Sequence, residues 1–250
     1  MDRLRRKVQR HVMRRLLLLS DISFFTTPCE KVPWVPAGAK NILFIPVGAN
    51  LPSPEKAWNQ KRDTLESKPC IGVFSITGNP RAQQEIGLIS EAVSHAAKQV
   101  GPVRVVVFGR NSEAGEDLRV KLAGSPVEVI VLGLIPAEEI VPVLGASDVL
   151  LFVRGQISSR RGSAIAGIAC GLPVIAQEGS ETAPPITEAG LVLVPATAPS
   201  EFGPALLRVL SDQAYRASLA ERSRNAQQRY FSWSVIAAQY AKALEKRKTT

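Results

Sequence analysis

The sequence has few of the residues that build metal centres and disulfide frameworks. Its 250 residues include three cysteines, Cys29, Cys70 and Cys170, and two histidines, His11 and His95. The cysteines are odd in number and far apart, so they predict neither a set of disulfides nor a zinc site. Neither histidine has partners arranged for nucleophilic catalysis. We therefore predict no metal site, and we interpret the chain as a cytoplasmic protein with reduced thiols.

Long apolar runs are missing from the N-terminal segment. Residues 1–19 end in four leucines, 16–19. A secretory apolar region needs about 7–15 such residues and a spanning helix about 20. The segment is therefore interpreted as neither a signal peptide nor a membrane anchor.

Little net positive charge lies outside this same segment. The chain carries a net charge of +9, but residues 1–15 hold seven basic residues and one acidic residue, a balance of +6, which leaves +3 for the other 235 residues. No aromatic residues are interleaved with the basic ones to stack on bases, so we predict no nucleic-acid partner. We predict a basic amphipathic helix here. Packing on a neighbouring domain is favoured for it, and peripheral contact of residues 3–15 with the inner face of a membrane stays open.

What the sequence does contain is a regular alternation of short apolar strands and helices from residue 70 onward. This alternation predicts an α/β fold with a Rossmann-like parallel sheet and flanking helices. Ligands of such sheets bind beyond the carboxyl ends of the strands. The expected strands are 71–74, 104–108, 127–132, 149–153, 174–176 and 189–195, and the expected helices are 83–100, 116–122, 137–144, 163–170, 201–210, 213–228 and 234–243.

Four segments are predicted. Residues 1–52 contain two strands, 22–27 and 41–46, that lack enough partners for a stable sheet, so they are interpreted as the remnant of an N-terminal domain. Residues 53–69 are expected to be a linker, residues 70–230 the nucleotide-binding domain, and residues 231–250 a crossing helix and tail.

One motif carries the strongest chemical signal. Ser158-Ser159-Arg160-Arg161-Gly162-Ser163 comes directly before an apolar run, where a helix is expected to begin. A helix N-terminus offers free N–H groups and a partial positive charge, so hydroxyls and guanidinium groups there favour a phosphate or diphosphate. Two plainer interpretations stay open. The arginines can be solvated charges, and the serines are expected first of all to be N-caps.

Several motifs in order along the chain resemble the C-terminal half of GT-B-fold retaining glycosyltransferases, the group-one glycosyl transferase family. The resemblance covers about residues 20–245. It rests on Pro46-Val47-Gly48-Ala49-Asn50, Val107-Phe108-Gly109, Leu132-Gly133-Leu134-Ile135-Pro136, Ala146-Ser147-Asp148, Ala169-Cys170-Gly171-Leu172-Pro173, Gly190-Leu191-Val192 and Phe231-Ser232-Trp233.

The resemblance implies two facing Rossmann-like domains. The C-terminal one would hold a nucleotide-sugar donor, and the N-terminal one would hold a glycan or lipid-linked acceptor, with no metal ion and no cofactor. Residues 1–52 would be the last piece of the N-terminal domain, so a second chain that supplies the rest is considered as a partner. The implied function is sugar transfer in polysaccharide or glycoconjugate synthesis. The alternative is an inactive remnant or partner subunit that acts through protein contacts.

The resemblance also implies site residues. The diphosphate would be bound by residues 158–163, and also by Arg81, the cation nearest the first loop of the domain, where the family's Arg and Lys have no clean match. The family usually has two glutamates where Ser158 and Ala166 stand in this chain. No catalytic residue is assigned. The residues expected at the nucleotide are Gly78, Gly109, Gly133, Ile135 and Glu139, although glycines also make turns and an acidic residue also suits the first turn of a helix.

Overall fold

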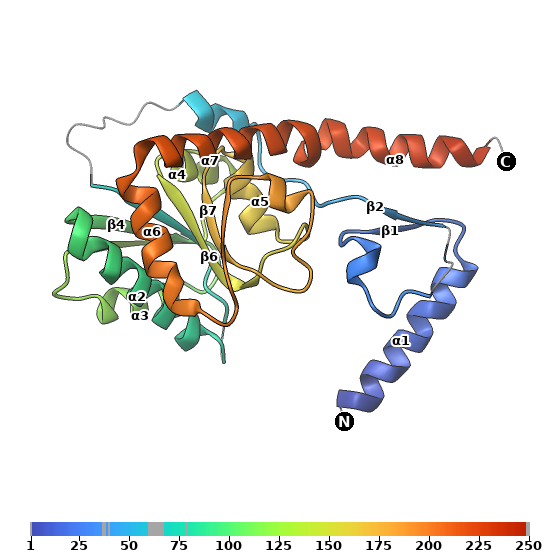
Figure 1. Ribbon diagram of the computed structural model, residues 1–250, viewed down its shortest axis with the longest axis horizontal. Helices are drawn as coiled ribbons and strands as arrows, with labels where there is room; N and C mark the ends of the chain where they lie inside the picture. The colour runs from blue at the N-terminus through green and yellow to red at the C-terminus, as the bar shows by residue number, and fades with distance from the viewer. Residues whose placement is uncertain (1, 37–38, 40, 60–67, 79, 249–250) are drawn as a thin grey trace.

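The computed structural model describes residues 2–36, 39, 41–59, 68–78 and 80–248. Figure 1 shows a large α/β unit and a smaller N-terminal arm, with the last helix reaching from the first toward the second.

Six strands form the sheet of the large unit, and every pairing in it is parallel. The sheet order is β5-β4-β3-β6-β7-β8. Most strand residues are apolar and buried, as expected of strands covered on both faces. The predicted α/β fold with a parallel sheet is therefore confirmed. The strands are β3 (Cys70–Phe74), β4 (Val103–Phe108), β5 (Val127–Gly133), β6 (Val149–Gln156), β7 (Val174–Gln177) and β8 (Leu191–Val194).

Helices cover both faces of this sheet and create two cores. One core includes side chains of α2 (Ala82–Val100), α3 (Ser112–Lys121) and α6 (Phe202–Ser211). The other includes side chains of α4 (Ala137–Gly145) and α5 (Gly162–Ala169). The order of the strands reverses at β3, which pairs with β4 on one side and with β6 on the other. The crevice at such a reversal is where doubly wound sheets bind ligands.

The C-terminal helices join the two units. Helix α7 (Gln213–Ala226) continues into a π-helical turn, Gln227–Phe231, before α8 (Trp233–Lys248) begins. Trp233 Nε1 donates a 2.7 Å hydrogen bond to the carbonyl oxygen of Ala49. Farther along α8, the rings of Tyr240 and Phe24 lie 4.5 Å apart. The crossing segment predicted for residues 231–250 thus contacts the arm, as Figure 1 shows.

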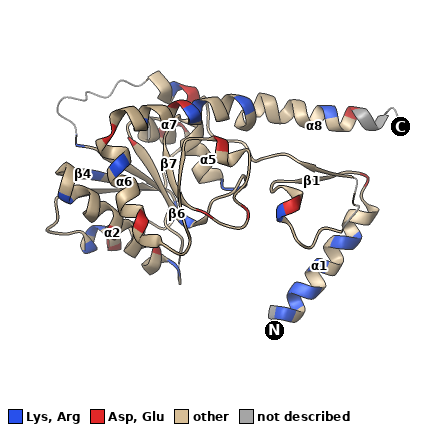
Figure 2. Cartoon of the chain, viewed as in Figure 1, with Lys and Arg blue, Asp and Glu red and all other residues tan. Residues whose placement is uncertain are grey.

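The N-terminal arm consists of one helix and two strands. Helix α1 (Asp2–Leu19) is followed by β1 (Ser23–Phe25), a 3₁₀ turn (Cys29–Lys31) and β2 (Ile42–Phe44), which pairs parallel with β1. Leu17 is buried, whereas the other described side chains of α1 are exposed. Its basic residues are visible along the helix in Figure 2. No helix of the described segments is long and apolar enough to span a lipid bilayer.

Some boundaries differ from the predicted ones. Helix α3 begins four residues earlier than expected, after Asn111 adopts a left-handed conformation with φ of 66°. In the predicted linker, Pro54–Asn59 form a 3₁₀ helix, and Trp58 Nε1 donates a 2.8 Å hydrogen bond to the carbonyl oxygen of Ala169. Residues 60–67 of that linker lie outside the described residues.

Candidate functional site

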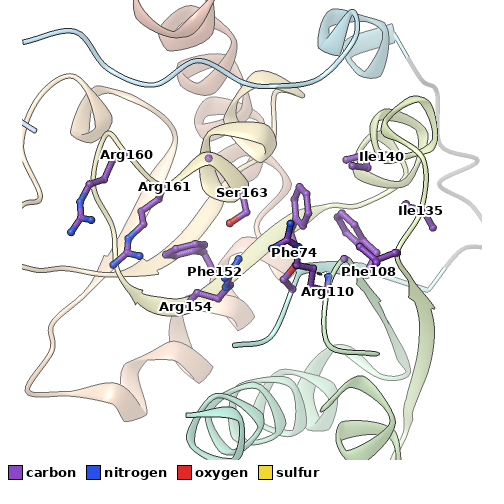
Figure 3. Close-up of a pocket in the computed structure, with 14 residues that line it drawn as sticks. Phe74, Phe108, Arg110, Ile135, Ile140, Phe152, Arg154, Arg160, Arg161 and Ser163 are labelled. Atoms are coloured by element: carbon purple, nitrogen blue, oxygen red, sulfur yellow. Dashed lines mark hydrogen bonds between the residues drawn. The ribbon is translucent and has the colours of Figure 1, made fainter. Parts of the chain in front are cut away.

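A pocket of about 510 Å³ opens at the carboxyl ends of β3, β4, β5 and β6, beside the first residues of α5 (Figure 3). It therefore lies at the reversal of strand order, where the fold predicts a ligand. The lining residues are Phe74, Ser75, Phe108, Gly109, Arg110, Leu134, Ile135, Ile140, Phe152, Arg154, Arg160, Arg161, Gly162 and Ser163.

The loops after β3 and β4 are tied together at one side of the pocket. Ser75 has a φ of 66°, and its N–H donates a 2.7 Å hydrogen bond to the carbonyl oxygen of Phe108. Its Oγ accepts a 3.2 Å hydrogen bond from the N–H of Arg110. Gly109 lies between them with a φ of 102°, and a Cβ atom there would overlap Ser75 Oγ. Glycine at 109 thus lets the two loops approach and places Arg110 at the pocket.

An apolar wall forms the end of the pocket beside these loops. The rings of Phe74 and Phe108 lie 4.7 Å apart at an angle of 34°. Ile135 and Ile140 lie on the same side of the pocket in Figure 3. Aromatic and aliphatic surfaces of this kind suit a planar ring such as a nucleobase.

A local irregularity of β6 brings a second arginine to the opposite end. Phe152 pairs with Ala176 and Gln156 pairs with Gln177, so three residues of β6 leave the ladder between two consecutive residues of β7. Gly155 in this excursion has a φ of 74°. Arg154 lines the pocket, and its Nε is buried without a hydrogen-bond partner among the described residues. Strand irregularities often re-aim a side chain toward a site in this way.

The two arginines of the motif complete the cationic end. Arg161 Nε donates a 3.0 Å hydrogen bond to the carbonyl oxygen of Gln156, and Arg160 Nε donates a 2.7 Å hydrogen bond to Glu181. Burial lowers the pKa of Arg161, and the positive charges of Arg160, Arg154 and Arg81 lower it further, while Glu181 opposes them. Positive charge is therefore concentrated around Arg161.

The serines of the motif do not act as N-caps, so that interpretation was wrong. The N-cap residue of α5 is Arg161, and its side chain makes no capping hydrogen bond. Ser158 and Ser159 are 1% and 0% exposed, and their hydroxyls have no partner among the described residues. The two serines lie in the loop before α5, which begins at Gly162. In that loop the carbonyl oxygen of Ser159 accepts a 3.0 Å hydrogen bond from the N–H of Val47.

The structure brings some of the predicted site residues together at the pocket. Gly109, Ile135, Arg160, Arg161, Gly162 and Ser163 line the pocket. Gly133 lies behind it, where its carbonyl oxygen accepts a 2.7 Å hydrogen bond from Gly109. The other predicted residues, which do not line it, are Gly78, Arg81, Glu139, Ser158 and Ser159.

Two arginines of the pocket were not predicted, Arg110 and Arg154. Arg154 directly follows Val153, the last residue of a buried apolar run, and Arg110 comes two residues after Phe108, the last residue of another. Because the carboxyl ends of parallel strands share one edge, a basic residue just after a buried strand was the signal that could have found both. In the described part of the chain, no three His, Cys, Asp or Glu side chains gather as metal ligands do.

The fold and the position of the pocket define a Rossmann-like domain of the GT-B type. Residues 71–212 match the family model described as "Glycosyl transferases group 1". The match covers more than half of the 250 residues, so the chain belongs to this family. No functionally curated protein matches the sequence.

Solved structures share the fold at low sequence identity. A glycosyltransferase from Rickettsia africae superposes with a TM-score of 0.72 at 14% identity, covering 95% of this chain and 66% of that one. HepE of Anabaena, solved with UDP and glucose, superposes with a TM-score of 0.67 at 17% identity, covering 95% of this chain and 67% of that one. For sucrose-phosphate synthase from Thermosynechococcus elongatus the TM-score is 0.66 at 24% identity, and the match covers 97% of this chain and 62% of that one. The chain thus spans about two thirds of the length of these proteins or slightly less.

Proposed function

We propose that this protein binds a nucleotide-sugar donor in the pocket at the carboxyl ends of β3–β6 and takes part in transfer of the sugar to an acceptor. One observation carries the proposal. The pocket joins an apolar wall around Phe74 and Phe108 to a cationic end around Arg161, and the start of α5 lies at that cationic end. This layout fits a nucleobase at one end and a diphosphate at the other.

The cationic end also suits the chemistry of the transfer. When the bond between the sugar and the diphosphate breaks, negative charge grows on the leaving phosphate oxygen. Guanidinium groups and helix N–H groups that are already in place stabilise this charge without reorganising. Arg160, Arg161 and the N-terminus of α5 are the groups that we assign to this task.

The test is a calorimetric titration of the whole chain with UDP, GDP and ADP. We expect the best nucleotide to bind at least about 100-fold more weakly to the double variant Arg160→Ala, Arg161→Ala, because charge-assisted hydrogen bonds contribute about 1.5–3 kcal/mol each. The control is Arg119→Ala on α3, whose side chain is exposed, lies outside the pocket and pairs with Glu116. Unchanged affinity in the double variant would remove the central claim.

We further propose that the N-terminal arm is completed by another polypeptide segment, which supplies most of the acceptor site. Two features support this. A pair of parallel strands is not stable alone, and parallel sheets are normally covered on both faces. Helix α1 also exposes an apolar row of residues, Leu4, Val8, Val12 and Leu16, at 48–71%. The acceptor would be a glycan or lipid-linked glycan of polysaccharide or glycoconjugate synthesis.

Two alternatives for the arm have distinct outcomes. A protein that binds nucleotide sugars, but neither hydrolyses nor transfers them with any added partner, would be an inactive remnant or a partner subunit. Sedimentation with anionic vesicles that disappears when residues 3–15 lose their charge would instead favour peripheral membrane contact.

The free thiols of Cys29, Cys70 and Cys170 support a reducing compartment such as the cytoplasm.

A further inference from the structure

The pocket holds more positive charge than a nucleoside diphosphate neutralises. Four arginines line it, 110, 154, 160 and 161, and no carboxylate lines it. Glu181 offsets one of them by pairing with Arg160. Among the described residues, the other three guanidinium groups have no ion-pair partner. The diphosphate of a nucleotide sugar carries one acidic oxygen on each phosphate, and therefore two charges, so one positive charge of the pocket stays uncompensated.

The hydrogen-bonding chemistry points the same way. A neutral sugar presents hydroxyl groups that need acceptors as well as donors, and a guanidinium group is a donor only. Ser75 and Ser163 supply the side-chain acceptors among the lining residues of the pocket. A carboxylate on the sugar, which is an acceptor only, matches a wall of arginines better.

Arg154 is the arginine with the clearest need for an acceptor. Its Nε is buried without a partner among the described residues, and an unsatisfied buried donor is costly to keep. The excursion of β6 and the left-handed Gly155 hold this side chain at the pocket. In Figure 3 its side chain lies beside Phe152, between Arg161 and Arg110, and away from Ile135 and Ile140.

We propose that the transferred sugar is acidic, a uronic acid linked to a nucleoside diphosphate, and that Arg154 binds its carboxylate. This inference rests on the proposed function, because it assumes a nucleotide-sugar donor in the same pocket. Arg154 is then a specificity-determining residue, whereas Arg160 and Arg161 bind the diphosphate that all such donors share.

The test compares two donors that differ only at C6 of the sugar, UDP-glucose and UDP-glucuronate, by calorimetry on the whole chain. If GDP binds better than UDP, the pair is GDP-mannose and GDP-mannuronate. We expect the acidic donor to bind about 10–100-fold more tightly, as a charge-assisted bidentate pair allows. Arg154→Gln should abolish this preference, so that the acidic and neutral donors bind with affinities within about threefold of each other. Arg119→Gln, which removes the same charge outside the pocket, should keep the preference.

The outcomes separate the two proposals. If no nucleoside diphosphate binds, both fail. If a nucleoside diphosphate binds but the acidic and neutral donors bind equally, the proposed function stands and the acidic donor is ruled out. The third charge could also belong to the acceptor, and glucose 6-phosphate added to the UDP-saturated protein tests this source. Binding of the sugar phosphate that depends on Arg154, without a preference for the acidic donor, would likewise overturn the inference.

Discussion

Arg160 and Glu181 form an ion pair across the mouth of the pocket, with 2.7 Å between Nε and the carboxylate oxygen. The two residues come from different loops, one before α5 and one after β7. The same region is held by Thr182, whose Oγ1 donates a 2.7 Å hydrogen bond to the carbonyl oxygen of Ile157. Glu181 is thus a fixed anion next to the proposed diphosphate site, and it competes with the ligand for Arg160.

Replacing this carboxylate should strengthen nucleotide binding. We expect Glu181→Gln to bind the preferred nucleoside diphosphate about threefold more tightly at low salt, because Arg160 then has no competing anion. The gain should shrink at 0.5 M salt, where charges at the surface are screened. Calorimetry at two salt concentrations measures both effects. Weaker binding by the variant would mean that Glu181 positions Arg160 rather than competing for it.

Gly109 should tolerate no side chain. Gly109→Ala places a Cβ atom at a φ of 102° and against Ser75 Oγ, so we expect a loss of about 2–4 kcal/mol in the free energy of unfolding. Urea denaturation measures it. The control is Gly87→Ala inside α2, where a Cβ atom has its nearest neighbour at 4.0 Å and alanine should stabilise the helix by about 0.5–1 kcal/mol. A Gly109→Ala protein as stable as the control would contradict the described loop.

Trp233 should hold the arm onto the large unit. Trp233→Phe keeps an aromatic ring but removes the hydrogen bond to the carbonyl oxygen of Ala49. A hydrogen bond contributes about 1 kcal/mol, so we expect amide exchange in residues 45–51 to accelerate about fivefold. Trp58→Phe is the matched control, because it removes the equivalent indole bond to Ala169 on the large unit. Equal exchange in both variants would show that other contacts hold the arm.

Cys170 should make the protein less stable at alkaline pH. Burial raises the pKa of its thiol to about 12, whereas an unfolded chain has a thiol pKa of about 8.5. Between these values the folded state binds more protons than the unfolded state, so this contribution to stability is complete below about pH 8.5 and is lost as pH rises toward 12.

This loss can be measured as a difference between two proteins. The stability of the wild type minus that of Cys170→Ala should fall by about 1.4 kcal/mol per pH unit above pH 8.5, because other titrating groups cancel in the difference. Urea denaturation at pH 8, 9 and 10 provides the values. A difference that does not change with pH would place the thiol in contact with water.

The sheet was predictable from the sequence because buried parallel strands are nearly continuous apolar runs. Val103–Phe108 and Val149–Val153 are examples, and both helix-strand alternation and the position of the pocket follow from them. Arg160 and Arg161 were also found, because a helix N-terminus after a strand has a recognisable sequence. These parts depend on local pattern and on general rules of topology.

Other parts of the site depend on contacts that no local pattern records. The sequence does not indicate that β6 continues to Gln156 after three residues outside the ladder, so the expected strand, 149–153, stops just before Arg154. The serines were expected to cap α5, but they lie in the loop before it, where the carbonyl oxygen of Ser159 accepts a hydrogen bond from the N–H of Val47. In both cases a neighbour distant in sequence decides the geometry.

The excursion of β6 separates the pairing of the strand from the choice of the side chain that it presents at the pocket. Residues up to Phe152 and from Gln156 onward are paired with β7, so the sheet continues on both sides of the loop that carries Arg154. We therefore expect exchanges of Arg154 to leave the strand pairing intact while they change the group at the pocket, whereas Val153 is part of the core. If Arg154 selects the donor as proposed, a library at this one position would alter the donor preference without rebuilding the fold.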